Sequence, residues 1–285
     1  MHALLNHPAV QAGLAPFLVA LLTAELFQRM RLSGLAIIAG FAITVYLMNG
    51  FGVDPLTSTR KIIWLGVFAA ALGIPLMLLD SSLWRPVLTV LGGAAAVWVC
   101  IRVLEQHPVP TALQWGLGCA LYVGWLVLWM DTLYESPVRA ASAGFTLAMG
   151  TGLAVLIGAS ASLGQLGLAV GSAALAYLLI MFVTNSHLSC GRVFTLPLAL
   201  ISGLVGCLAV FTAKLPWYAL PALGAIPLVA RMPVSDRMGV WVQSTVANNP
   251  WTSSSLSEPT RRTFPSSSSI RGASASPRRS SPPAR

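Results

Sequence analysis

The stretch that decides the fold is LGQLGLAVGSAALAYLLIMFV, from Leu163 to Val183. It carries no charged residue, and it matches the roughly 20 residues that an α-helix needs to cross about 30 Å of hydrocarbon. Its apolar residues are continuous, whereas a transmembrane β-strand alternates apolar and polar positions. A helix, which satisfies its own backbone hydrogen bonds, is the other structure that can span a bilayer. The stretch therefore predicts a transmembrane helix.

Similar runs fill most of the chain. Of its 285 residues, 56% are apolar and only 9% are charged, against roughly 25% charged in a soluble domain. These values exclude a soluble globular protein, and the hydrophobicity excludes a fully disordered chain. The sequence predicts an all-α, polytopic transmembrane helix bundle. We expect eight spans, at about residues 10–27, 32–48, 62–79, 87–104, 111–130, 140–157, 163–183 and 193–213.

A ninth apolar segment, at residues 215–230, is interrupted by proline. Pro216 suits the start of a helix, but Pro221 and Pro227 each remove a backbone hydrogen bond. A kinked or re-entrant segment fits this pattern as well as a straight span. The orientation of the bundle depends on this segment, because the basic residues near the ends of the first eight spans divide into five on one side and four on the other.

The composition changes at residue 231. Residues 231–285 contain 14 Ser, 7 Pro and 8 Arg with two acids, and they contribute +6 of the formal net charge of +9. We expect a transmembrane domain at 1–230 and a disordered segment at 231–285. Three interpretations of this segment stay open: a solvated tail, a contact with anionic lipid headgroups, or the product of a shifted reading frame of a GC-rich gene.

Few ionisable residues lie near the predicted spans, and these are the candidate site residues. Glu25 and Arg29 share a helix face at the end of the first span, and Arg102 and Glu105 form a similar pair near the end of the fourth. Asp131 begins the most polar internal loop. Interfacial ion pairs and snorkelling explain the two pairs, and a proton or substrate site at a helix end is the functional alternative.

Motifs for catalysis, cofactors and metals are missing from the sequence. No G-x-S-x-G, H-E-x-x-H or phosphate-binding loop occurs, so we expect no enzyme activity and no cofactor. His187 and Cys190 form a lone H-x-x-C pair, which supplies two ligands where a structural zinc needs four. We therefore expect no metal site, and we expect the four cysteines to serve as small packing residues.

Small residues recur at intervals of four in several spans, as in Gly116, Ala120 and Gly124. Such stripes let helix backbones approach closely. They favour packing within the chain, and a homodimer or a contact with another membrane protein through the same faces is the alternative. The expected partner is the lipid bilayer and not nucleic acid, because most of the positive charge lies beyond residue 230.

Three functions are compatible with this pattern. The first is a permease or carrier for a small, weakly charged solute, in a multi-pass protein of the bacterial inner membrane. It predicts a polar cavity in the bundle. The second is a non-transporting assembly factor or complex subunit, which predicts a solid bundle with an exposed groove. The third is a membrane-embedded transferase, which needs polar residues to converge at one leaflet. The residues available for that are Glu25, Asp80, Arg85, Arg102, Glu105 and Asp131.

Overall fold

The computed structural model describes residues 7–27, 32–48, 51–52, 57–78, 83–158, 160–184, 190–212 and 215–232. Over these residues the chain is helical and contains no strand, which confirms the all-α prediction. A π-helical turn, η1 (Val10–Leu14), leads into the first α-helix. The α-helices are α2 (Ala15–Phe27), α3 (Leu35–Leu47), α4 (Ser58–Leu78), α5 (Trp84–Leu104), α6 (Val109–Asp131), α7 (Pro137–Ile157), α8 (Ala161–Thr184), α9 (Gly191–Thr212) and α10 (Ala219–Ala230).

Seven helical segments in the described part of the chain are long and apolar enough to cross a membrane. This number is compatible with a multi-pass membrane protein, but the predicted count of eight spans is not confirmed. The second predicted span, α3, has 13 residues, and the proline-rich α10 has 12. α3 is shorter than predicted because residues 32–34 form a turn, in which the amide of Leu35 donates to the carbonyl of Leu32 at 2.9 Å.

Several charged residues that were predicted between spans belong to helices. Arg60 and Lys61 lie in the first turn of α4, Asp131 is the last residue of α6, and Arg139 lies in the first turn of α7. The predicted polar loop from Asp131 to Arg139 is therefore reduced to the turn at residues 132–136. Pro137 begins α7 because a proline needs no hydrogen-bond acceptor at a helix start.

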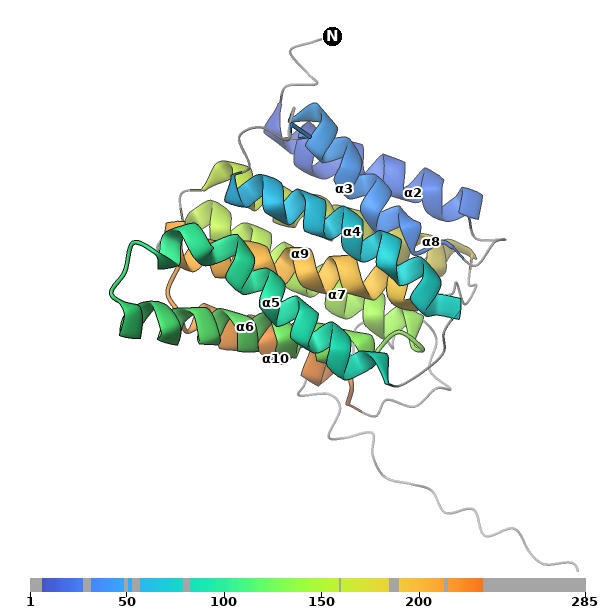
Figure 1. Ribbon diagram of the computed structural model, residues 1–285. Helices are drawn as coiled ribbons and strands as arrows, with labels where there is room; N and C mark the ends of the chain where they lie inside the picture. Colours follow the sequence, from blue (N-terminus) through green and yellow to red (C-terminus); the bar gives the residue numbers. More distant parts are fainter. Residues whose placement is uncertain are drawn as a thin grey trace, which may run out of the picture.

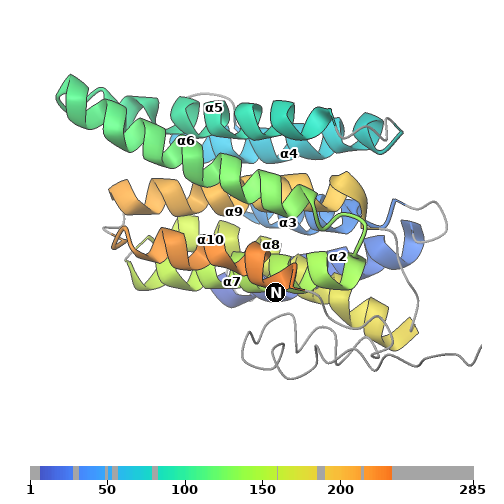
Figure 2. The same cartoon turned by 90° about the horizontal axis from the view of Figure 1, so that it is seen from below.

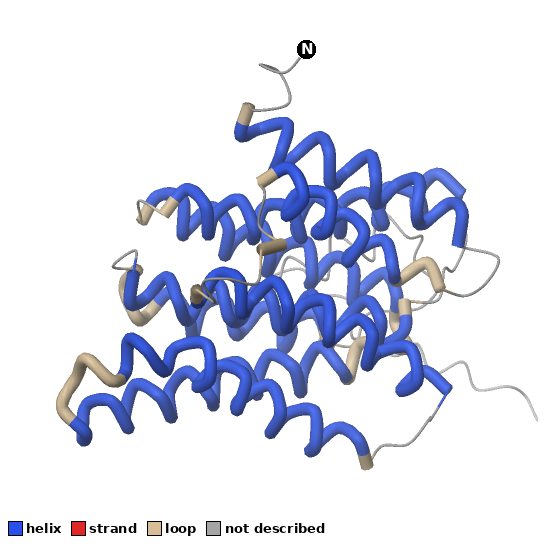
Figure 3. Tube along the Cα trace, turned by 45° about the horizontal axis from the view of Figure 1, so that its top comes forward, coloured by secondary structure: helices blue, strands red, loops and turns tan. Residues whose placement is uncertain are grey.

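α9 forms the centre of the bundle. All its residues from Gly191 to Ala209 are buried, as expected of a helix that is apolar on every side. α4, α5 and α6 lie on one side of α9, and α2, α7, α8 and α10 lie on the other (Figures 1 and 2). The helices run alongside one another, with the connecting segments near the two ends of the bundle (Figure 3).

Glycines bring helix backbones into direct contact. A Cβ atom on Gly167 of α8 would lie 2.7 Å from the Cα of Gly152 of α7. A Cβ on Gly93 of α5 would lie 3.0 Å from the carbonyl oxygen of Ala120 of α6. The small-residue stripes therefore pack inside the chain, where lipid-like side chains alone would give little attraction between helices.

Four helices enclose a common interior. α9 packs against α6 and α7, and α10 packs against the same two helices from the other side. Trp125 of α6 donates its Nε1–H to the carbonyl of Gly224 in α10 at 3.0 Å. A Cβ on Gly206 of α9 would lie 3.6 Å from the hydroxyl of Tyr122 in α6 and 3.7 Å from Thr151 in α7. We call α6, α7, α9 and α10 the four-helix ring.

Candidate functional site

A buried ionic cluster lies at one end of the bundle. Asp131 is only 1% exposed, and its Oδ1 accepts a hydrogen bond from Arg192 Nε at 2.9 Å. Its Oδ2 accepts one from Arg85 Nε at 3.2 Å. The three residues come from the end of α6 and the starts of α9 and α5. A single carboxylate thus serves two guanidinium groups.

Arg192 is the most deeply buried cation of this cluster, with a side chain that is 3% exposed. Gly191 has a φ of +61°, which glycine adopts without strain, and it turns the chain into α9. The Nη1 of Arg192 donates to the carbonyl of Leu76 at 3.2 Å, and its Cζ lies 5.0 Å from the centre of the Tyr134 ring. These contacts hold the guanidinium in place at the end of the bundle.

The burial of this cluster is costly. Removing an ion from water costs several kcal/mol, and an ion pair offsets that cost only when its geometry is good. Arg85 is partly in solvent, with 34% of its side chain exposed, whereas Asp131 and Arg192 are not. Basic residues that set the orientation of a membrane protein act from the membrane surface. Setting the orientation therefore does not explain why Asp131 and Arg192 are buried.

Four buried side-chain polar atoms in the described part of the chain have no hydrogen-bond partner, and all of them lie on α6 and α9. They are Tyr122 Oη, Trp129 Nε1, Thr195 Oγ1 and Ser202 Oγ. Tyr122 and Trp129 are seven residues apart on α6, and Thr195 and Ser202 are seven apart on α9. Seven residues are close to two helical turns, so each pair shares one helix face.

The two hydroxyls of α9 differ from other hydroxyls of the bundle. Thr89 and Thr151 each donate to the carbonyl four residues earlier, at 2.8 Å and 2.7 Å, as is usual inside membrane helices. Thr195 and Ser202 do not. They lie on the same side of α9 as Gly206, which contacts Tyr122 and Thr151 inside the four-helix ring.

Buried polar groups normally have partners, and those without one call for an explanation. In this protein the four atoms without a partner lie one after another inside the four-helix ring, from the ionic cluster towards the middle of the bundle. Trp129 and Thr195 lie two and three residues from Asp131 and Arg192 in their helices, and Tyr122 and Ser202 lie about 10 Å further in. At the depth of Gly206 the interior is filled by side chains, among them Leu220 and Tyr122.

The residues that the sequence indicated do not form one site. Glu25 is exposed near the end of α2, and Arg102 and Glu105 are exposed at the end of α5, opposite to Arg85 at its start. Arg29 lies outside the described residues. Of the other four candidate site residues, only Asp131 takes part in the ionic cluster, where it binds Arg85, a residue named for the transferase hypothesis.

The sequence did not identify Arg192, Thr195 or Ser202 as site residues. It named Arg85, the other partner of Asp131, only for the transferase hypothesis. Arg192 lies directly before the longest buried apolar run. This position is the feature of the sequence that could have indicated Arg192. Thr195 and Ser202 gave no signal, because the sequence does not show which threonines and serines will be bonded to their own helix.

A second buried cation lies in α4. Lys61 is 5% exposed, and its Nζ donates to the carbonyl of Trp98 at 2.9 Å and lies 4.7 Å from the centre of the Trp98 ring. It contacts α5 at the opposite end from Arg85, so it belongs neither to the ionic cluster nor to the ring.

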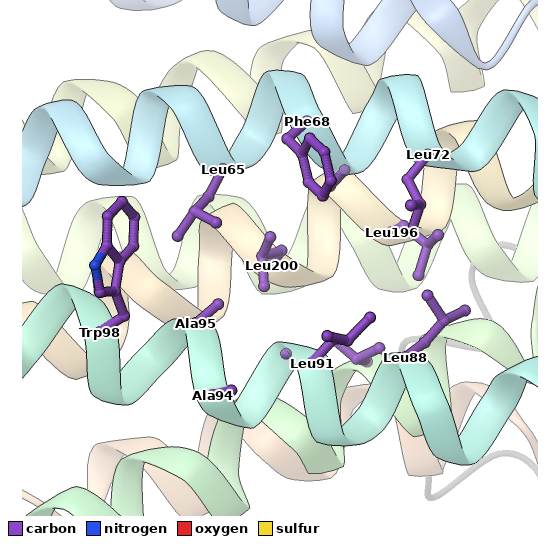
Figure 4. A pocket seen from close by; sticks show the side chains of 13 residues that line it. Leu65, Phe68, Leu72, Leu88, Leu91, Ala94, Ala95, Trp98, Leu196 and Leu200 are labelled. Atoms are coloured by element: carbon purple, nitrogen blue, oxygen red, sulfur yellow. The ribbon is translucent and has the colours of Figure 1, made fainter. Parts of the chain in front are cut away.

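Apolar grooves open on the outside of the bundle. One groove of about 310 Å³ lies between α4 and α5, with Leu196 and Leu200 of α9 as its floor (Figure 4). A second, of about 590 Å³, lies between α6 and α10 and contains Trp115, Trp125 and Trp217. Both grooves are lined almost entirely by apolar side chains, so they suit lipid chains or apolar helices better than a polar solute.

The described residues contain no group of three or more His, Cys, Asp or Glu side chains that could hold a metal ion. Burial raises the pKa of the Cys190 thiol well above its ordinary value, so this thiol stays protonated and is a poor ligand or nucleophile. Its predicted companion, His187, lies outside the described residues.

Comparison of the chain with protein-family models, with curated proteins and with solved structures gave no match. The composition and the helices are compatible with a multi-pass membrane protein. Any more specific function has to be argued from the ionic cluster, the four-helix ring and the grooves.

Proposed function

We propose that the protein is a permease for a small, weakly charged solute, and that the solute passes through the interior of the four-helix ring. The observation that carries this proposal is the position of the unpaired polar groups: Tyr122, Trp129, Thr195 and Ser202 all lie on two ring helices. Water or a polar solute can supply the hydrogen bonds that the protein does not. In a bacterial cell such a helical protein belongs to the inner membrane, and the transport role needs no catalytic group.

The ring also contains the residues that would let it move. Pro197 lies inside α9 and Pro227 inside α10, and each removes a backbone hydrogen bond from its helix. Both helices continue through their proline, and the missing hydrogen bond marks a point at which a helix can bend. Opening of the ring at the depth of Leu220 would then need only a rearrangement of α10 against α6 and α7.

The test is solute entry into liposomes that contain the purified full-length chain, measured with small neutral, anionic, zwitterionic and cationic solutes. We expect at least one class to enter faster than into protein-free liposomes. If none does, the permease proposal fails.

Thr195→Val and Ser202→Ala separate transport from a purely structural role of these hydroxyls. Removing an unpaired buried donor is expected to stabilise the fold by about 1–3 kcal/mol. The proposal adds that solute entry is lost in the double variant. Thr89→Val, which removes a hydroxyl outside the ring, is the matched control and should leave entry unchanged. Unchanged solute entry in the double variant would show that the solute does not pass through the four-helix ring.

A second candidate function, a non-transporting assembly factor or subunit, is supported by the groove between α4 and α5. Trp98 and Phe68 line it from two helices that make little contact with each other (Figure 4). An apolar helix of another membrane protein would fit such a surface. Two results together would favour the assembly-factor function. The liposomes would show no solute entry, and Ala95→Trp, which narrows the groove, would impair growth of the host cell.

A further inference from the structure

The groove between α4 and α5 has one charged end. Its two walls are stripes of apolar side chains at helical spacing on the facing sides of the two helices. The stripes include Leu65 and Leu72 on α4, and Leu91, Ala95 and Trp98 on α5 (Figure 4). Four residues further towards the same end of the bundle, each stripe continues with a cation. These cations are Lys61 on α4 and Arg102 on α5.

Contacts between the start of α4 and the end of α5 hold the two cations near each other. The Nζ of Lys61 donates to the carbonyl of Trp98 at 2.9 Å, and in an α-helix the amide of Arg102 points to that same carbonyl. The Oγ of Ser58 donates to the carbonyl of Val99 at 3.1 Å, which fixes α4 to the same turn of α5. Two positive charges therefore lie at one end of the groove.

The other charged residues of these helix ends are directed elsewhere. Arg60 is directed to Gly52, because a Cβ on Gly52 would lie 2.9 Å from its Nη2. Glu105 lines a separate groove between α5 and α6. Within the described part of the chain, no ion pair joins either cation of the groove end to an acid.

Arg102 is the cation that a ligand can touch. Its side chain is exposed, and a guanidinium group binds phosphate oxygens through pairs of parallel hydrogen bonds. Lys61 is only 5% exposed, and its ammonium lies 4.7 Å from the centre of the Trp98 ring. Lys61 therefore acts through its charge, and it holds in place a ring that is 43% exposed at this end of the groove.

The size of the groove suits a hydrocarbon chain. From Leu88 to Trp98 the groove follows about 15 Å of α5, and its volume is about 310 Å³. A helix about 10 Å across and of this length occupies on the order of 1,200 Å³, so it could cover the groove but not enter it. An apolar helix would also leave Lys61 and Arg102 without a counterion. A ligand with an apolar chain and an anionic head matches both the groove and its charged end.

We propose that this groove binds one anionic phospholipid, with an acyl chain between α4 and α5 and the phosphate at Arg102. α4 and α5 are long and apolar enough to cross a membrane, so the groove between them lies where lipid chains surround the protein. The proposal does not depend on the permease function. It gives a role to Arg102, one of the candidate residues from the sequence, and it explains the position of Lys61.

The test of the charged end is native mass spectrometry of the purified full-length chain with phosphatidylglycerol, which is anionic, and phosphatidylcholine, which is zwitterionic, with identical acyl chains. We expect the chain to retain one phosphatidylglycerol in preference to phosphatidylcholine. Arg102→Gln should weaken this binding roughly fivefold, the effect of one basic residue at a headgroup. The control is Arg231→Gln, at an exposed arginine beyond α10 at the opposite end of the bundle. Equal effects of the two substitutions would overturn the proposal.

The test of the apolar part uses the same measurement. Ala95→Trp fills the groove and should reduce retention of phosphatidylglycerol, whereas Ala71→Trp, at an exposed position on another face of α4, should not. Glycerol phosphate, which has the anionic head without acyl chains, should not be retained. Equal retention of the two lipids, or retention of glycerol phosphate, would overturn the proposal. Equal retention of the two lipids would also leave a helix of another protein as the occupant of the groove.

Discussion

Asp131 shows how strongly one residue depends on its partners in this bundle. The sequence places it at the end of an apolar run, where a carboxylate normally faces water. In the structure it is buried and binds Arg85 and Arg192. Its negative charge is what makes the burial of Arg192 tolerable, since an unpaired buried guanidinium is far more costly than the pair.

Asp131→Asn is therefore expected to lower the free energy of unfolding by about 3–5 kcal/mol, because it leaves Arg192 buried without an opposite charge. The measurement is unfolding of the purified protein in detergent. The control is Glu105→Gln, at an exposed position, which should change stability by no more than about 0.5 kcal/mol. Equal stability of the two variants would show that the ionic cluster is not buried.

The burial of each cysteine side chain determines whether its thiol can react. Cys100, Cys119, Cys190 and Cys207 are all buried and free in the structure. We expect a maleimide to modify none of them in the folded protein and all of them after unfolding in SDS, as followed by the mass of the intact chain. Gln106→Cys adds an exposed thiol as a positive control. Rapid modification of any native cysteine in the folded protein would contradict the described packing.

At the scale of elements, backbone contacts through glycine determine which helices become neighbours. α7 and α8 touch at Gly152 and Gly167, and α5 and α6 touch at Gly93. The stripes were visible in the sequence, but the pairing of the helices was not, because a small residue is complementary to any other small residue.

Gly167→Ala is expected to destabilise the protein by about 1–3 kcal/mol, because the added methyl group would meet the Cα of Gly152 and force α7 and α8 apart. Gly118→Ala in α6 is the matched control. A Cβ at Gly118 meets no atom within 4 Å, so this change should be neutral or stabilise the helix by up to about 1 kcal/mol. Unfolding in detergent measures both, and equal effects would contradict the close α7–α8 contact.

At the scale of the molecule, α5 to α7 pass back and forth between two ends. The turn at residues 132–136 lies beside the ionic cluster, and the turn at residues 105–108 lies at the far end of α5 and α6. If α6 crosses the bilayer, these two turns face opposite sides of the membrane.

Single cysteines at the two turns test this arrangement in intact membranes. We expect Glu135→Cys and Gln106→Cys, both at exposed positions, to react with a membrane-impermeant maleimide from opposite sides. The native cysteines should not interfere, because they are buried. Labelling of both from the same side would mean that α6 does not span the membrane.

The sequence by itself determined that the protein is an all-α bundle with long apolar helices, because a bilayer imposes helices and a minimum length on any spanning segment. It located the limits of most helices to within a few residues. It placed the start of α3 too early, at Leu32, because residues 32–34 continue the apolar pattern but form a turn. It also named Asp131 as a candidate, as the first residue of a polar loop, and the structure places this residue in the buried ionic cluster.

Only the tertiary structure decided that α9 is the central helix, that α6, α7, α9 and α10 enclose a common interior, and that Asp131 binds Arg85 and Arg192. The physical reason is that apolar helices in lipid have no hydrophobic preference for one another. Their neighbours are chosen by close packing of small residues and by a few polar contacts between distant parts of the chain, and neither can be assigned until the helices are placed side by side.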